Sequence, residues 1–256
     1  MKYLIFFTIL IFLFSGVVAN LNDATALISE EIRFRQAILD SVYDIDENVA
    51  SASLFLTESD IPNETALSLL EPLKKSHLAI TFVALTSPEG AISQVSPGSY
   101  MPLVGTHIPH AIPDDGQKRP FISSNPEWSQ TVPPGQDLVW PVRTSSGIEY
   151  IVIHLNAEKL CADAAENANI SPEFFSAVLD HDGEVLWSSD YDELMSVPPE
   201  GVLTEFPTFR DVKDLMRYAW TGRTVHDVWN SNGIVRTGVW SSVQVYNQVW
   251  GVFVAE

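Results

Sequence analysis

The sequence lacks the features that mark several classes of protein. Cys161 is the only cysteine among 256 residues, so no disulfide can form within the chain. Lys and Arg number only 14 against 33 Asp and Glu, and the formal net charge of -19 argues against nucleic acid or an anionic membrane surface as a partner. No apolar run after residue 20 is long enough to cross a membrane, which takes about 20 residues.

The motifs of common enzymes are also missing. We find no G-x-S-x-G, G-x-x-x-x-G-K-S/T, H-E-x-x-H or G-x-G-x-x-G, and therefore predict no enzyme, no catalytic residue and no cofactor. His107 and His110, with Asp114 and Asp115 close by, are residue types that bind metals. Because Pro109 and the loop setting fix no geometry for them, we predict no metal site.

The N-terminus has the pattern of an export signal. Lys2 is followed by an almost unbroken apolar run from Tyr3 to Phe14 and by the small residues Val17, Val18 and Ala19. We predict that residues 1–19 are a signal peptide, with an uncleaved N-terminal anchor as the alternative. Either way we expect the rest of the chain to be extracytoplasmic, secreted or held at the membrane by that anchor.

A long helix is predicted next, over residues 20–57. The segment contains no Pro or Gly, and its apolar residues recur at steps of three, four or seven: Ile28, Ile32, Leu39, Val42, Val49 and Leu56. Arg35 and Asp46 interrupt this stripe. In one interpretation the helix packs along its own domain. In the other interpretation a second copy of the chain also packs on the helix, which predicts a homodimer. The two interpretations are compatible.

Beyond the helix, apolar runs and turn residues predict strands. A second helix begins near Asn63, and we expect Pro72 to kink or divide it. Strands are expected at 79–85, 91–95, 138–142, 148–155, 176–179, 185–187, 224–229, 234–245 and 249–255, and further helices at 157–168 and 208–222. The stretch 96–136 is rich in Pro, Gly, Ser and Asp, and loops of this length in compact domains are often functional.

The order of these elements repeats within the chain. Gly90 and Gly183 occupy the same place in two hairpins, 93 positions apart. Trp140 aligns with Trp240 and Tyr150 with Trp250, each pair 100 positions apart. A period near 100 residues is the size of a small domain, so the pattern predicts two copies of one module.

Five segments carry a resemblance to a known family. They are "FVALTSPEGAISQVSPGSYMPLVGTHI", "KRPFISSNPEW", "FFSAVLDHDGEVLWSSD", "VWSSVQVYNQVWGVFVAE" and the long helix before them. Their order resembles the double Cache family of extracytoplasmic sensor domains, in which two PAS-like modules follow a stalk helix. The resemblance implies an α+β fold: a long N-terminal helix and two modules, each a mainly antiparallel sheet with flanking helices. The fuller Tyr/Arg/Trp/Asp signature of the family's amino-acid-binding subgroup is not found.

The resemblance also sets the expected domain boundaries. They are a stalk helix at 20–57, a membrane-distal module at 58–156, a connecting helix at 157–172 and a membrane-proximal module at 173–256. Family members normally continue into a cytoplasmic kinase or chemotaxis output. Because this sequence ends at Glu256, we expect it to act alone or to signal through a membrane partner.

The predicted function is recognition of a small molecule in the distal module. Arg119 is the main candidate, because a guanidinium binds a carboxylate with two hydrogen bonds and Pro120 and Phe121 could hold it in place. The other candidate ligand-binding residues are aromatic: Tyr100, Phe121, Trp128, Trp140 and Tyr150. The alternative is a secreted structural or protein-interaction module whose interior is filled by its own side chains.

Overall fold

The computed structural model describes residues 2–58, 63–108, 119–123, 128, 132–144, 147–181, 183–190, 225–231 and 234–256. Its helices are α1 (Lys2–Glu58), α2 (Asn63–Ser76), the short 3-10 helix η1 (Gly98–Leu103) and α3 (Ala157–Asn167). Its strands are β1 (Ile80–Thr86), β2 (Ile92–Ser96), β3 (Phe121–Ser123), β4 (Gln136–Thr144), β5 (Gly147–Leu155), β6 (Phe175–Leu179), β7 (Val185–Ser188), β8 (Val225–Ser231), β9 (Ile234–Val245) and β10 (Gln248–Ala255). The predicted helix at 208–222 lies outside the described residues.

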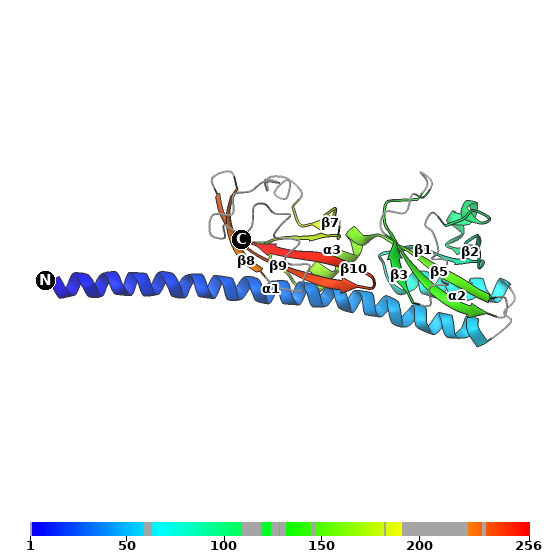
Figure 1. The fold of residues 1–256 in the computed structure, drawn as a ribbon, viewed down its shortest axis with the longest axis horizontal. Helices are drawn as coiled ribbons and strands as arrows, with labels where there is room; N and C mark the ends of the chain where they lie inside the picture. Colours follow the sequence, from blue (N-terminus) through cyan, green and yellow to red (C-terminus); the bar gives the residue numbers. More distant parts are fainter. Residues whose placement is uncertain are drawn as a thin grey trace. The chain divides into compact units, whose positions relative to one another are not determined.

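The strands form two antiparallel sheets with the same plan (Figure 1). The N-terminal sheet has the strand order β2-β1-β5-β4-β3, and the C-terminal sheet has the order β7-β6-β10-β9-β8. Two compact units contain them. The N-terminal unit consists of Ala37–Ala165 and Gln244–Val249, and the C-terminal unit of Met1–Gln36, Glu166–Val243 and Trp250–Glu256. The α+β fold of two PAS-like modules after a long helix is therefore confirmed.

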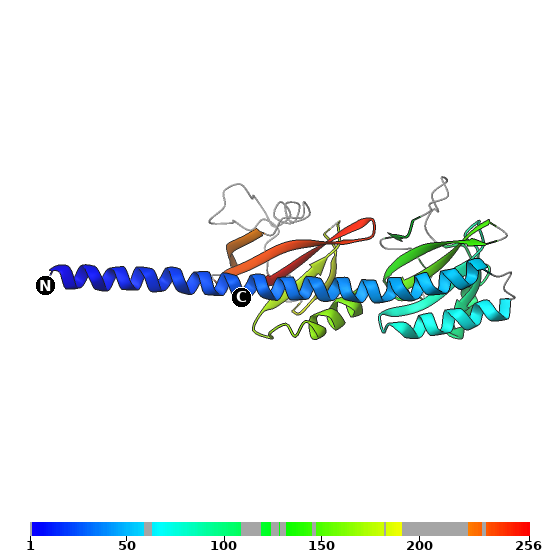
Figure 2. The same ribbon diagram turned by 90° about the horizontal axis from the view of Figure 1, so that it is seen from below.

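Helix α1 begins earlier than predicted and is continuous from Lys2 (Figure 2). Its buried residues recur at helical spacing: Leu27, Glu31, Phe34, Ile38, Ile45, Val49, Ala52 and Leu56. In the C-terminal unit, Phe34 packs edge-on against Trp187 of β7, with ring centroids 5.4 Å apart. Among the described residues, no helix carries an apolar stretch long enough to span a bilayer.

The two polar residues that interrupt the stripe of α1 have partners. Arg35 Nε lies 3.2 Å from Glu31 Oε1, four residues earlier on the same helix. Asp46 Oδ1 accepts a hydrogen bond of 2.6 Å from the hydroxyl of Tyr246. Pro72 does not divide α2, which continues as one helix to Ser76, so the expected division is wrong.

The repeat is most clearly seen in the first hairpin of each sheet. Gly90 N donates to Ser87 O and Ser87 N to Ala91 O, and Gly183 N and Asp180 N make the same two bonds 93 residues later. Gly90 and Gly183 have φ values of 82° and 86°, which glycine adopts without steric cost. The 93-residue correspondence is therefore confirmed.

The predicted correspondence of Trp140 with Trp240 is wrong by one residue. Thr144 and Gly147 close the β4–β5 hairpin, and Val245 and Gln248 flank the equivalent turn of β9–β10, so the offset is 101. Val139 is the residue equivalent to Trp240. Because neighbouring residues of a strand point to opposite faces, Trp140 and Trp240 lie on opposite faces of their sheets.

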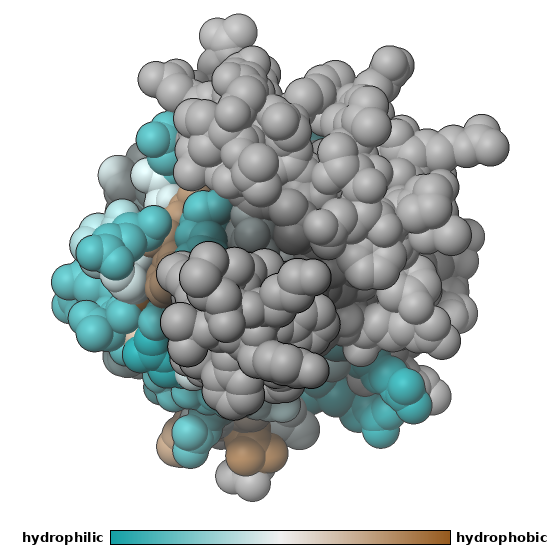
Figure 3. Space-filling view, turned by 90° about the vertical axis from the view of Figure 1, so that its left-hand side faces the viewer, coloured by the Kyte–Doolittle hydropathy of each residue, from teal (hydrophilic) through white to brown (hydrophobic). Residues whose placement is uncertain are grey.

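Figure 3 shows the hydropathy of one side of the molecule. Its coloured residues are mainly hydrophilic, with small hydrophobic patches between them. The apolar side chains are instead concentrated in the strands, where most residues of β1, β5, β6 and β10 are buried.

Candidate functional site

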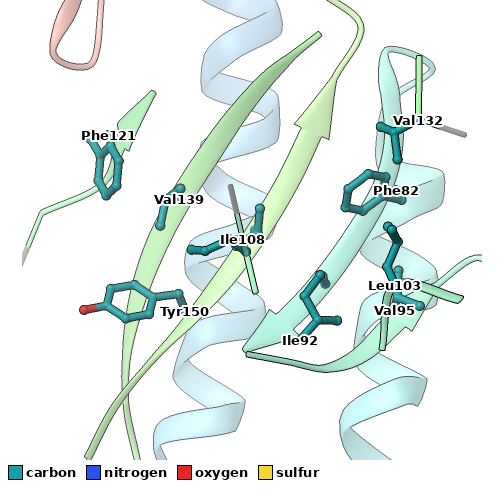
Figure 4. Packing of buried hydrophobic residues seen from close by; sticks show 11 residues of the cluster. Phe82, Ile92, Val95, Leu103, Ile108, Phe121, Val132, Val139 and Tyr150 are labelled. Carbon is teal, nitrogen blue, oxygen red and sulfur yellow. The ribbon is translucent and has the colours of Figure 1, made fainter. Parts of the chain in front are cut away.

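The candidate site is on the face of the N-terminal sheet opposite to the α-helices, here called the front face (Figure 4). Strand registers arrange its side chains in rows. One row contains Phe82, His154, Asp137 and Ser123. The next contains Val95, Ala84, Val152, Val139 and Phe121. Figure 4 shows the apolar members of these rows, with the helices passing behind the sheet.

An apolar cluster covers this face. Its buried members are Phe82, Ala84, Ile92, Val95, Leu103, Ile108, Phe121, Val132, Val139, Tyr150 and Val152. Three partly buried residues pack against it, namely Tyr100, Trp128 and Ile148. Side chains from η1 and from loops thus meet the sheet here, and the face is lined with aromatic rings whose edges reach the surface.

Phe82 is at the centre of the aromatic residues. Its ring stacks on the imidazole of His154, with centroids 5.0 Å apart and planes 9° apart. Trp128 meets Phe82 edge-on at 5.3 Å, and Tyr100 lies tilted against it at 5.0 Å. Aromatic contacts of this kind add about 0.5–1.5 kcal/mol each beyond burial, so they fix the position of Trp128 and Tyr100.

A buried polar network passes through the same residues. Trp128 Nε1 donates to Asp137 Oδ2 at 2.9 Å. The other carboxylate oxygen of Asp137 lies 2.7 Å from His154 Nδ1, and His154 Nε2 lies 2.9 Å from the carbonyl oxygen of Pro133. Asp137 and His154 are almost completely buried, so these contacts replace the water that both groups lose.

The partners of His154 define where its protons are. A carbonyl oxygen can only accept, so Nε2 must carry a hydrogen for the bond to Pro133. Nδ1 faces the Asp137 carboxyl oxygen at hydrogen-bond distance. Removing one member of this pair would leave the other buried without its hydrogen-bond partner.

Gly135 makes room for this network. A Cβ atom at this position would lie 2.3 Å from the Leu155 carbonyl oxygen and 2.7 Å from His154 Nε2. Real Cβ atoms do not approach backbone oxygen this closely, so only glycine fits beside the imidazole.

The structure brings four of the six predicted ligand-binding residues together. Phe121 and Tyr150 are buried members of the cluster, and Tyr100 and Trp128 pack on it. Arg119 is exposed and precedes Phe121 by two residues; within the described part of the chain it makes no hydrogen bond or ion pair.

Trp140 is not brought together with these residues. The alternation of β4 places it on the helix-facing side of the sheet, because its neighbour Val139 is on the front face. The loop segments 109–118, 124–127 and 129–131, which include His110, Asp114 and Asp115, lie outside the described residues. The part that is described contains no group of His, Cys, Asp and Glu able to hold a metal ion.

Sequence reasoning missed Asp137, His154 and Gly135. The signal was present, because a carboxylate and an imidazole each occur in an otherwise apolar strand, in "QDLVWPV" and "YIVIHL". A charged residue at a buried strand position needs a partner of opposite charge. Two such residues in strands that were predicted to pair could have been matched with each other.

The corresponding face of the C-terminal sheet is built differently. Trp240 stacks on Phe253 with ring centroids 3.8 Å apart, and Phe175 meets Phe253 at 5.6 Å. At the positions equivalent to Asp137 and His154 this sheet has Gly238 and Ala255. Large aromatic side chains thus occupy the face that carries the polar network in the N-terminal sheet.

Comparison with known proteins identifies the fold. No protein-family model matches the sequence, and none of the curated proteins matches it in sequence. Among solved structures, an extracellular ligand-binding receptor from Desulfohalobium retbaense is similar, with a TM-score of 0.63 and 15% identity over 88% of this chain and 39% of the receptor. The extracellular domain of a protein assigned as a histidine kinase, rpHK1S-Z16, is also similar. Its TM-score is 0.65, with 15% identity over 92% of this chain and 95% of that domain.

A third structure agrees with these two. The ligand-binding domain of the Campylobacter jejuni chemoreceptor Tlp3, solved in complex with L-valine, gives a TM-score of 0.63 and 10% identity over 95% of this chain and 96% of that domain. The chain has the fold of a double Cache sensory domain. The match covers 39% of the Desulfohalobium receptor, so the chain spans less than half of that protein's length.

Proposed function

We propose that this chain is an extracytoplasmic sensor domain that binds a small molecule on the front face of the N-terminal sheet. The observation that carries the proposal is the packing there of Tyr100 and Trp128, both partly exposed, on the buried cluster that contains Phe121. Arg119 is exposed and precedes Phe121 by two residues in the chain. Small-molecule sites are mainly apolar and aromatic, with a few placed polar groups. The front face has this composition, whereas its counterpart in the C-terminal sheet carries the stacked rings of Trp240 and Phe253.

The chemistry of the face favours a carboxylate as part of the ligand. Arg119 is exposed, and its guanidinium can match an anionic group. A guanidinium binds a carboxylate through two parallel hydrogen bonds. The L-valine bound by the similar Tlp3 domain carries such a group. An amino acid or another small carboxylate is therefore the proposed ligand class.

Signalling would follow from a difference in affinity between two states. A ligand shifts a conformational equilibrium only if it binds one state better than the other. The sensor folds to which this chain is similar include chemoreceptor domains, so a membrane signalling protein is the proposed partner. The partner protein would convert the shifted conformational equilibrium of this chain into a signal.

A homodimer through α1 is also proposed. Ile32, Tyr43 and Leu54 are 48, 61 and 63% exposed and lie eleven residues apart. Eleven residues are about three turns, so these side chains share one side of the helix. Sedimentation velocity should show a dimer that Tyr43→Glu converts to monomer. A wild-type monomer at all concentrations would contradict the homodimer.

Thermal-shift titration tests the ligand proposal. The panel contains the twenty standard L-amino acids and the unbranched C2–C6 mono- and dicarboxylates. We expect a saturable rise in Tm, since ligand at 1,000 times Kd stabilises by about 4 kcal/mol. Arg119→Ala should weaken binding at least tenfold. Arg119→Lys, which keeps the charge, should recover only part of it, and Lys159→Ala, which removes a charge from α3, should leave it unchanged.

Two results would count against the proposal. Binding that is equally strong in Arg119→Ala would move the site away from this residue. If no compound of the panel shifts Tm, the structural or protein-interaction alternative is favoured, and capture of a partner protein becomes the next experiment.

A further inference from the structure

The tip of the β9–β10 hairpin belongs to the unit of the N-terminal sheet. Residues Gln244–Val249 cluster with Ala37–Ala165, although both strands that lead to the tip belong to the other unit. The tip residues contact β3, the strand that carries Phe121.

Asn247 pairs with the backbone of β3. Its Oδ1 accepts a hydrogen bond of 2.7 Å from Ile122 N, and its Nδ2 donates one of 3.2 Å to Ile122 O. Gln248 Nε2 donates a second bond to the same carbonyl at 3.3 Å. The side-chain amide of Asn247 therefore does for Ile122 what a neighbouring strand would do.

This pairing matters because β3 is short and lies at the sheet edge. It contains three residues, and β4 is its neighbour on one side only. An edge strand leaves the N–H and C=O of alternate residues without a strand partner. Both backbone groups of Ile122 point outward to Asn247, and Ile122 lies opposite Leu138 in the register of β3 with β4. These contacts fix the position of Phe121 on the front face.

The hairpin tip is itself held by α1. The Tyr246 hydroxyl donates to Asp46 Oδ1 at 2.6 Å, and Gln244 Nε2 donates to the carbonyls of Tyr246 and Gln248 within the tip. Burial, followed by the Asp46 contact, raises the pKa of Tyr246, so its hydroxyl keeps its proton and remains a donor. The tip is thus a braced element with contacts on both α1 and β3.

We infer that Asn247 is a positioning residue for the ligand site and that ligand occupancy is linked to the state of the hairpin tip. The inference rests on the proposed function, because it places the ligand against the strand that Asn247 holds. Linkage is reciprocal: if the tip strengthens ligand binding, bound ligand must stabilise the tip by the same factor. Strands β9 and β10 connect the tip covalently to the C-terminal sheet. A change in the conformation of the tip would therefore affect these two strands directly.

The experiment compares Asn247 variants with a matched control. Asn247→Ala removes both bonds to Ile122, and Asn247→Asp keeps the shape and one acceptor but loses the donor. Gln244→Ala is the control, because it removes two bonds of the same tip that do not involve Ile122. All are measured at a temperature at which circular dichroism shows each variant fully folded; Gln248→Ala replaces any variant that does not fold.

The first readout needs no ligand. In protein labelled with 5-fluorotryptophan, the ¹⁹F resonance assigned to Trp128 through Trp128→Phe should shift or broaden in both Asn247 variants and stay unchanged in Gln244→Ala. An unchanged Trp128 resonance in both Asn247 variants would overturn the inference.

The second readout uses the panel compound that raises Tm of the wild type most. Its Kd should rise about tenfold in Asn247→Ala, and it should slow hydrogen exchange of residues 244–249 in the wild type. Equal Kd values, or no protection of the tip, would overturn the linkage. If no compound binds the wild type, the proposed function fails, and the ¹⁹F result alone decides whether Asn247 positions the front face.

Discussion

The two sheets share a topology but differ in how their front faces are filled. Val139 and Val152 of the N-terminal sheet correspond to Trp240 and Phe253 of the C-terminal sheet. Asp137 and His154 correspond to Gly238 and Ala255. Small apolar residues and a buried Asp–His hydrogen bond therefore occupy one sheet, and stacked aromatic rings occupy the other.

This difference suggests different roles for the two modules, with stability favoured in the C-terminal sheet and ligand binding proposed for the N-terminal sheet. A sheet packed with aromatic rings gains stability from their burial, while a sheet with smaller side chains and buried polar groups gains less. Natural proteins depart from the most stable filling mainly at functional sites. The N-terminal sheet is the one that departs, which is why we assign the ligand to it.

The largest expected effect is on the stability of the C-terminal sheet. Trp240→Ala removes a buried indole stacked at 3.8 Å on Phe253 and should lower the free energy of unfolding by about 5 kcal/mol. Val139→Ala at the equivalent position should cost about 2 kcal/mol, because it removes only two methyl groups. Urea unfolding measures both.

Trp240→Phe sharpens this comparison. The indole Nε1 of Trp240 is buried without a hydrogen-bond partner, so Phe keeps a stacked ring and removes an unsatisfied donor. Its cost should be well below that of Trp240→Ala. Equal costs for Trp240→Ala and Val139→Ala would mean that the two faces are filled alike.

The buried Asp137–His154 contact gives the next largest effect. Asp137→Ala leaves the buried His154 imidazole without its hydrogen-bond partner on Nδ1 and should cost about 3 kcal/mol. The double variant Asp137→Ala/His154→Ala imitates the C-terminal sheet and should cost less than the two single variants together. Additive costs in the double-mutant cycle would show that the two side chains do not interact.

Gly135→Ala tests the space beside the imidazole. Its Cβ would meet Leu155 O at 2.3 Å, and we expect a loss of about 2 kcal/mol in thermal or urea unfolding. Gly98→Ala is the matched control, since nothing lies within 4 Å of the Cβ it adds. A neutral Gly135→Ala would contradict the close approach of β5.

The smallest effect concerns the contact of α1 with the C-terminal sheet. Burial raises the pKa of Glu31 above its ordinary value of 4.5, against the lowering effects of the Ser241 hydrogen bond and the Arg35 charge. A raised pKa favours the folded state below pH 4.5, and that contribution is lost as pH rises through the folded pKa. Glu31→Gln should therefore gain stability relative to the wild type between pH 4 and pH 7.

Urea unfolding of both proteins at several pH values tests this sign. The difference in unfolding free energy between Glu31→Gln and the wild type should move in favour of the variant as pH rises. A difference that stays constant with pH would show that burial does not raise the pKa of Glu31.

Much of the fold could be predicted from the sequence because its signals are local. Alternating and continuous apolar runs marked the strands, and glycine turns marked the first hairpins. Strand β3 was missed because three residues within a polar stretch carry no periodicity. The match of Trp140 with Trp240 failed because a shift of one residue in a strand exchanges the faces, and identity of residue type does not report the face.

The candidate site was predicted in part for a similar reason. Aromatic residues in and near the long loop indicated a binding surface, and Phe121, Trp128 and Tyr150 do lie together. The partnership of Asp137 with His154 depends on the pairing of β4 with β5, and the contact of Asn247 with Ile122 joins residues 125 positions apart. Only the tertiary structure brings such pairs together.

The most direct test is a crystal structure of the protein soaked with the panel compound that raises Tm most. We expect its density on the front face of the N-terminal sheet, with a carboxylate group within hydrogen-bond distance of Arg119 and an apolar part against Tyr100 and Trp128. Density against Trp240 in the C-terminal sheet, with the front face of the N-terminal sheet empty, would contradict this account.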